Sequence, residues 1–81
     1  MAISQKPELK KTLRNKVRGY RALQGDLTQQ QLADVVGCSR QTIISIETSR
    51  FTPSVELAIR LANALNVKVE DLFYFEGETK P

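Results

Sequence analysis

Residues Thr28 to Arg50 read TQQQLADVVGCSRQTIISIETSR, and this stretch decides the expected fold. It divides into two short helical patterns separated by a tight turn. Thr28 is a favourable N-cap for the first helix, and Gln31 three residues later completes a capping box. Gly37 can adopt a positive φ and end that helix abruptly. Ser39 then caps the next helix after only two or three linking residues.

The apolar residues of the stretch mark its inward face. Ala33 is small and falls in the middle of the first helix, where the second helix must cross closely. The two helices are expected to pack against each other through Cys38, Ile43 and Ile46. With these residues inside, the start of the second helix faces outward. Its outward side chains are Ser39, Arg40, Gln41 and Thr42, with Ile44 and Ser45 one turn further on.

A helix with a polar, outward N-terminal turn fits the major groove of DNA, and the two helices together form a helix-turn-helix. Arginine can pair with guanine and glutamine with adenine, and an isoleucine that reaches a base would meet a thymine methyl. We therefore expect base contacts from Arg40, Gln41, Thr42, Ile44 and Ser45. Two alternatives stay open. Arg40 and Gln41 could be solvent-exposed without a partner, and Ile44 could mark a protein-binding surface.

Helical patterns also flank this stretch. Leu13, Val17 and Tyr20 share a face and predict a helix before this stretch, from about Thr12 to Leu23. Counted along the chain, this is the first helix, and the two helices of the stretch are the second and the third. A fourth helix capped by Ser54 carries the cleanest amphipathic pattern, and Asn66 is placed as its left-handed C-cap residue. A last short helix is expected from Val67 to about Phe73.

Composition fits a single small domain with a nucleic-acid partner. The 81 residues carry a net charge of +3, with a hydrophobic content of 41%. Residues 1–50 hold nine Lys and Arg against four Asp and Glu, whereas residues 51–81 hold three against five. A basic N-terminal part suits contact with a polyanion, although a solvated basic surface explains the charge equally well. Two interpretations of Arg14, Lys16 and Arg18 are equally favoured: they line the DNA backbone, or they form an ordinary solvated surface.

Other classes of protein fit less well. No apolar run is long enough for a membrane span or a secretory signal, so we expect a cytoplasmic protein. Histidine is absent and Cys38 is the single cysteine, which argues against a metal site and against acid–base or nucleophilic catalysis. We expect no enzyme, no cofactor and no small-molecule ligand.

The chain resembles the Cro/cI-type helix-turn-helix family, also called the XRE family. The matching residues are LTQQQLADVVGCSRQTIISIE, followed by NALNVKVEDLF. The resemblance implies an all-α, five-helix, lambda-repressor-like domain over residues 11–75, between a flexible arm (1–10) and a polar tail (76–81). It also implies a transcriptional regulator that binds a palindromic operator as a homodimer. An aromatic segment, Phe73, Tyr74 and Phe75, is the candidate dimer contact.

The resemblance also implies roles for individual residues. Arg40, Gln41 and Ser45 match base-facing positions, and Glu47 matches an acid that pairs with an arginine of the first helix, for which Arg21 is the candidate. Gln29 matches a glutamine that touches phosphate and braces the recognition helix. The expected phosphate contacts are Thr28, Gln29, Ser39, Thr48 and Arg50. The chain departs from the family at Thr48-Ser49, where Asn-Gly is usual.

Two functions follow from these observations. The first is a sequence-specific DNA-binding regulator, most simply a repressor, that places its third helix (Ser39 to Glu47) in the major groove. The alternative is the antitoxin of a toxin–antitoxin pair, which binds a protein partner and controls its own operon. The arm and the tail are short for wrapping a toxin, so we rank the alternative second.

Overall fold

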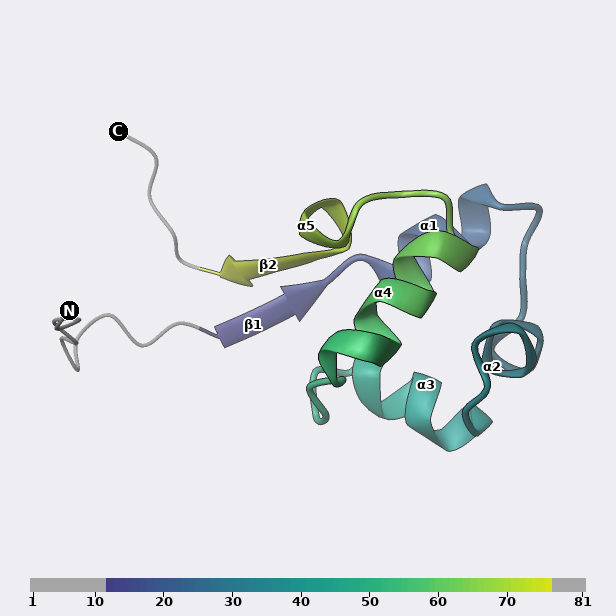
Figure 1. Ribbon diagram of the computed structural model, residues 1–81, viewed down its shortest axis with the longest axis horizontal. Coiled ribbons are helices and arrows are strands. Elements are labelled where there is room, and N and C mark those ends of the chain that lie inside the picture. The colour runs from purple at the N-terminus through teal and green to yellow at the C-terminus, as the bar shows by residue number, and fades with distance from the viewer. Residues whose placement is uncertain (1–11, 77–81) are drawn as a thin grey trace, which may run out of the picture.

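The computed structural model describes residues 12–76. The expected arm (1–10) and residues 77–81 of the expected tail lie outside the described residues. Helices dominate the described part, as expected (Figure 1). The elements in chain order are β1 (Thr12–Asn15), α1 (Val17–Leu23), α2 (Gln29–Val36), α3 (Arg40–Glu47), α4 (Val55–Ala64), α5 (Val69–Leu72) and β2 (Phe73–Glu76).

The caps expected from the sequence are present. Thr28 and Gln31 form the reciprocal capping box at the start of α2. Ser39 and Ser54 accept hydrogen bonds from the first turns of α3 and α4. Gly37 ends α2 with a φ of 82°, and Asn66 follows α4 with a φ of 59°. These residues satisfy backbone groups that a helix end leaves unpaired.

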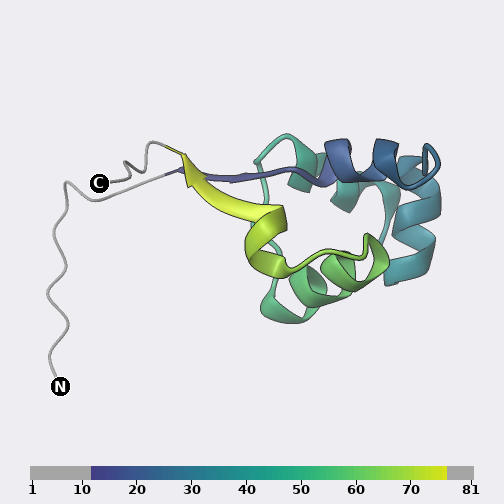
Figure 2. The same ribbon diagram turned by 90° about the horizontal axis from the view of Figure 1, so that it is seen from above.

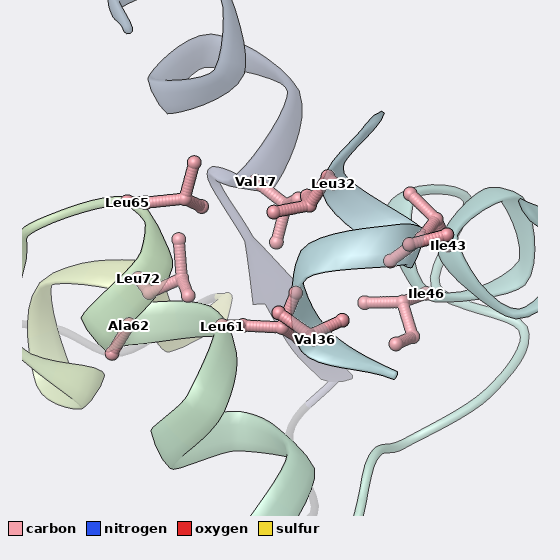
Figure 3. Packing of buried hydrophobic residues seen from close by; sticks show 10 residues of the cluster. Val17, Leu32, Val36, Ile43, Ile46, Leu61, Ala62, Leu65 and Leu72 are labelled. Carbon is pink, nitrogen blue, oxygen red and sulfur yellow. The ribbon is translucent and has the colours of Figure 1, made fainter. Parts of the chain in front are cut away.

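The core joins all five helices. Figure 3 shows the buried side chains of α2, α3 and α4 meeting those of Val17 from α1 and Leu72 from α5. Ala33 is fully buried where α2 packs on α3, in keeping with its expected role at a close crossing. The core residues are Val17, Leu32, Ala33, Val36, Ile43, Ile46, Leu61, Ala62, Leu65 and Leu72.

The all-α expectation is wrong in one respect, because the described residues include a two-stranded antiparallel sheet. Thr12–Asn15 is strand β1 rather than the first turn of a helix, and it pairs with β2. Leu13 lies opposite Phe75, and Asn15 lies opposite Phe73. The sheet projects from the helical part of the molecule in both views (Figures 1 and 2).

Asn15 explains why α1 begins at Val17 instead of Thr12. Its side-chain oxygen accepts a hydrogen bond from the Val17 amide (3.1 Å), and its side-chain amide donates to the Ile46 carbonyl (2.7 Å). Asparagine commonly makes such local backbone bonds, and they favour a break in the helix. The same residue thereby ties the base of the sheet to the C-terminal end of α3.

The last helix is also shorter than expected. It spans Val69–Leu72, and Phe73 opens strand β2 instead of closing the helix. Glu76, the first residue of the expected tail, is the last residue of that strand. Within residues 12–76, no helix is long and apolar enough to cross a membrane.

Candidate nucleic-acid interface

An ion pair fixes the angle between α1 and α3. The Arg21 Nε donates to Glu47 Oε2 at 2.7 Å, and its Nη2 donates to Glu47 Oε1 at 3.2 Å. Arg21 Nη1 also donates to the Leu27 carbonyl at 2.7 Å, and this bond holds the loop before α2. Both side chains are largely buried, with 15% of the Arg21 side chain and 6% of the Glu47 side chain exposed. The pair that the resemblance implied is therefore present in the structure and is structural.

Gln29 adds the second helix to this network. Its side-chain amide donates to Glu47 Oε1 at 3.1 Å, so one carboxylate receives bonds from α1 and from α2. Charge-assisted bonds of this kind are stronger than neutral ones. Three helices are thus joined at the end of α3, while the N-terminal turn of α3 carries no part of the network.

The outward residues of α3 lie where the sequence places them. The side chains of Arg40 and Gln41 are exposed, and those of Ile44 and Ser45 are half-buried at the surface. Among residues 12–76, neither Arg40 nor Gln41 forms a side-chain hydrogen bond or ion pair. Their donors and acceptors are therefore free to meet a ligand.

Three expected DNA contacts at the two ends of α3 also form hydrogen bonds within the protein. The Ser39 hydroxyl accepts from the Thr42 amide and shares a 2.9 Å hydrogen bond with the Thr42 hydroxyl. Thr42 is half-buried, so less of it faces outward than of Arg40 or Gln41. At the other end of α3, the Thr48 hydroxyl donates to the Ile44 carbonyl at 2.9 Å. Thr48 therefore presents acceptor lone pairs and not its hydroxyl proton.

The turn after α3 keeps a left-handed residue although the family's Asn-Gly is missing. Ser49 has a φ of 62°. Arg50 follows with an exposed side chain, and its amide donates to the Ser45 carbonyl at 2.8 Å. Serine rarely takes this backbone conformation, so the surrounding structure imposes it at an energetic cost.

The structure separates the three basic residues of the first helical pattern. Arg18 lines an open hollow of about 430 Å³ beside the start of α2, and Arg40 lines the same hollow. Arg14 instead pairs with Glu76 across the sheet at 2.5 Å. Lys16 lies 5.5 Å from the ring centroid of Tyr74. Of these three residues, only Arg18 therefore lies beside the expected DNA-facing residues. The sequence could not distinguish Arg18 from Arg14 and Lys16, because the three basic residues simply alternate along the chain.

Cys38 lies in the turn between α2 and α3 and packs against the core. Burial removes water from its thiolate form and raises the pKa of the Cys38 thiol. The cysteine is thus a small packing residue with lowered nucleophilicity at neutral pH, as its position between two helices indicated.

Comparison with known proteins agrees with this geometry. A family profile described as Helix-turn-helix matches residues 17–72. An HTH-type transcriptional regulator of Methanocaldococcus jannaschii is 47% identical over 66 residues, which cover 82% of this chain and 98% of that protein. Control protein C.SmaI of Serratia marcescens is 36% identical over 70 residues, which cover 86% of this chain and 82% of that protein.

Two solved structures share the fold. A DNA-binding protein from Bacteroides fragilis superposes with a TM-score of 0.68 and 26% identity, covering 76% of this chain and 98% of that chain. The restriction-modification controller protein C.AhdI from Aeromonas hydrophila gives a TM-score of 0.64 and 27% identity, covering 69% and 80%. The matched region contains α2, α3 and the core, and the family is one of DNA-binding regulators rather than enzymes. The chain therefore belongs to the XRE-type helix-turn-helix family of DNA-binding transcriptional regulators.

Proposed function

We propose that this protein is a sequence-specific repressor that places α3 in the major groove of a palindromic operator. One observation carries the proposal. The largely buried Arg21–Glu47 pair, together with Gln29, fixes the C-terminal end of α3 to α1 and α2, while Arg40 and Gln41 are exposed at its N-terminal turn. A recognition helix needs this combination, because base readout requires fixed geometry together with unpaired polar side chains.

The proposed contacts follow from the positions on α3 and at its two ends. Base contacts come from Arg40, Gln41, Thr42, Ile44 and Ser45, of which Arg40 and Gln41 carry the strongest potential for discrimination. Phosphate contacts come from Thr28, Gln29, Ser39 and Arg50, and from Thr48 once its hydroxyl turns from the Ile44 carbonyl to a phosphate oxygen. Each good bidentate base contact discriminates by roughly 1–3 kcal/mol. The relatives reported above are named as regulators and control proteins, which favours this function over that of an antitoxin.

Selection from random duplexes tests the proposal. The wild-type protein is expected to enrich a motif with two inverted half-sites. Arg40→Ala and Gln41→Ala are each expected to relax the preference at a different base pair of the half-site. A selection at low salt that enriches no motif contradicts sequence-specific binding. A reporter promoter that overlaps the enriched site tests the sign of regulation. Higher reporter expression in the presence of the protein than in its absence contradicts repression.

We further propose that the protein acts as a homodimer whose contact includes the sheet. Of the three aromatic residues expected there, Phe73 packs against the core, while Tyr74 and Phe75 are exposed. Phe75 and its cross-strand neighbour Leu13 lie on one face of the sheet, and Tyr74 lies on the other. The three aromatics therefore do not form one surface, and Phe75 is the best candidate for an apolar dimer contact.

The position of the sheet supports a two-fold axis close to it. Asn15 joins the base of the sheet to the C-terminal end of α3. A second copy bound at the sheet leaves the N-terminal turns of both recognition helices pointing away from the axis. This arrangement suits two successive major grooves, whose centres are about 34 Å apart.

Phe75→Lys tests this contact, with Leu23→Lys as a matched control. Both residues are exposed large hydrophobics, 51% and 76% exposed, but Leu23 lies on α1 away from the sheet. Sedimentation equilibrium is expected to give a monomer mass for Phe75→Lys and a dimer mass for Leu23→Lys. A dimer mass for both variants contradicts the proposed contact.

A further inference from the structure

A small hollow lies at the edge of the recognition face. Its volume is about 200 Å³, and it is lined by Ser39, Gln41, Thr42, Ser45 and Phe51. The first four belong to the set of expected DNA contacts. Phe51 does not, because the sequence assigns it only to the segment that connects α3 with α4.

The turn after α3 places Phe51 beside this helix. The amides of Arg50 and Phe51 both donate to the Ser45 carbonyl, at 2.8 Å and 3.2 Å. Together with the left-handed Ser49, these bonds fold the chain back along α3 instead of leading it away. The Phe51 ring therefore lines the same hollow as Gln41 and Ser45.

The ring of Phe51 does not serve the core. It is 48% exposed, and it belongs neither to the buried cluster nor to the partly buried residues packed against that cluster. A phenylalanine side chain has an accessible area of about 200 Å², so roughly 100 Å² of apolar ring surface faces outward here. That surface lies directly beside Gln41, an exposed side chain that is expected to read a base.

We propose that Phe51 is a specificity-determining residue that contacts the 5-methyl group of a thymine next to the base read by Gln41. This inference rests on the proposed function. The other walls of the hollow carry hydroxyl and amide groups, so the ring is its main apolar surface. In the major groove, thymine alone among the four standard bases presents a methyl group, and phenylalanine is one of the side chains that contact it.

Ile44 is the competing apolar residue of the recognition face, and it provides the matched control. It is half-buried on α3 and does not line the hollow of Phe51. If both residues contact thymine methyls, they contact different thymines. The experiment must therefore resolve individual positions of the operator.

The test uses the operator that duplex selection identifies. Each thymine is replaced in turn by deoxyuridine, which removes only the methyl group, and Kd is measured for wild type, Phe51→Ala and Ile44→Ala. At one thymine of each half-site, wild type is expected to lose about fourfold in affinity, the factor that corresponds to one methyl-sized group. Phe51→Ala is expected to bind both duplexes equally at that position, while Ile44→Ala keeps the fourfold difference.

Several results overturn the inference. One is a Phe51→Ala protein that retains the wild-type preference for thymine at every position. Another is a Phe51→Ala protein that becomes monomeric in sedimentation equilibrium, because the ring then serves the dimer contact. Phe51→Leu, which keeps an apolar side chain, is expected to retain part of the preference and replaces Phe51→Ala if that variant fails to fold. A selection that enriches no operator overturns the proposed function together with this inference, whereas an operator indifferent to the Phe51 variants overturns the inference alone.

Discussion

Replacing Glu47 with alanine removes the acceptor of three side-chain hydrogen bonds, two from Arg21 and one from Gln29. The Arg21 guanidinium then remains mostly buried, and within residues 12–76 its remaining hydrogen bond goes to the Leu27 carbonyl. Breaking a buried ion pair from one side costs about 3–5 kcal/mol. Because Arg21 keeps one bond and is 15% exposed, we expect the lower end, about 3 kcal/mol.

This loss is large for a domain of this size. Small domains unfold with total free energies of about 5–15 kcal/mol, so Glu47→Ala is expected to remove roughly one fifth to three fifths of the stability. At about 4–8 °C per kcal/mol, Tm is expected to fall by at least about 12 °C. Urea titration followed by circular dichroism at 222 nm measures the free energy, and a thermal scan measures Tm.

The exposed pair Arg14–Glu76 offers the matched control. Its atoms lie 2.5 Å apart, yet 44% and 55% of the two side chains are exposed. Solvent screening limits such pairs to about 0–1 kcal/mol, so Glu76→Ala is expected to cost far less than Glu47→Ala. Equal losses in the two variants, or a loss below about 1 kcal/mol for Glu47→Ala, would refute the role of burial assumed here.

Three further outcomes are expected. Ser49→Gly stabilises the protein by about 1 kcal/mol, because glycine adopts the observed φ of 62° without the steric cost that serine bears, and urea titration measures the gain. Cys38 reacts slowly with iodoacetamide at pH 7.5, and its rate rises only at alkaline pH, because the raised pKa keeps the thiol protonated; a rate equal to that of the urea-unfolded protein would contradict this. Arg50→Ala weakens binding to all duplexes alike and lowers the slope of log K against log salt by about 1, whereas Arg40→Ala changes sequence preference; filter binding over a salt series distinguishes the two.

The exposed polar residues of the candidate interface were predictable because their signals are local. A cap such as Thr28 or Ser39 acts on amides two or three residues away, and Gly37 ends α2 through its own φ. The outward face of α3 follows from the same local periodicity, because helical spacing separates Ile43 and Ile46 from Arg40 and Gln41. The helix caps and the outward face of α3 depend on residues that are close in the sequence, so tertiary context was not needed to identify them.

Phe51 shows why the sequence did not indicate every residue of the candidate interface. Nothing in the segment Phe51-Thr52-Pro53 indicates whether the ring lies in the core, in solvent or beside α3. Its position depends on the left-handed Ser49 and on the two amides that bond to the Ser45 carbonyl. The sequence shows that Thr48-Ser49 replaces the family's Asn-Gly at this turn. It does not show in which direction the chain continues after the turn.

The sequence alone determined the order of the helices, the turn between α2 and α3, and the exposed polar side chains at the start of α3. Only the tertiary structure decided that Thr12–Asn15 forms a strand. This segment satisfies a helical spacing and a strand alternation equally well, and its partner Phe73–Glu76 lies about sixty residues further along the chain. Asn15 accepts a hydrogen bond from the Val17 amide and donates one to the Ile46 carbonyl, and these bonds resolve the ambiguity, because Ile46 is a residue that only folding brings near. Local patterns fix elements whose hydrogen bonds close within a few residues, whereas pairing between distant segments is decided by the packed fold.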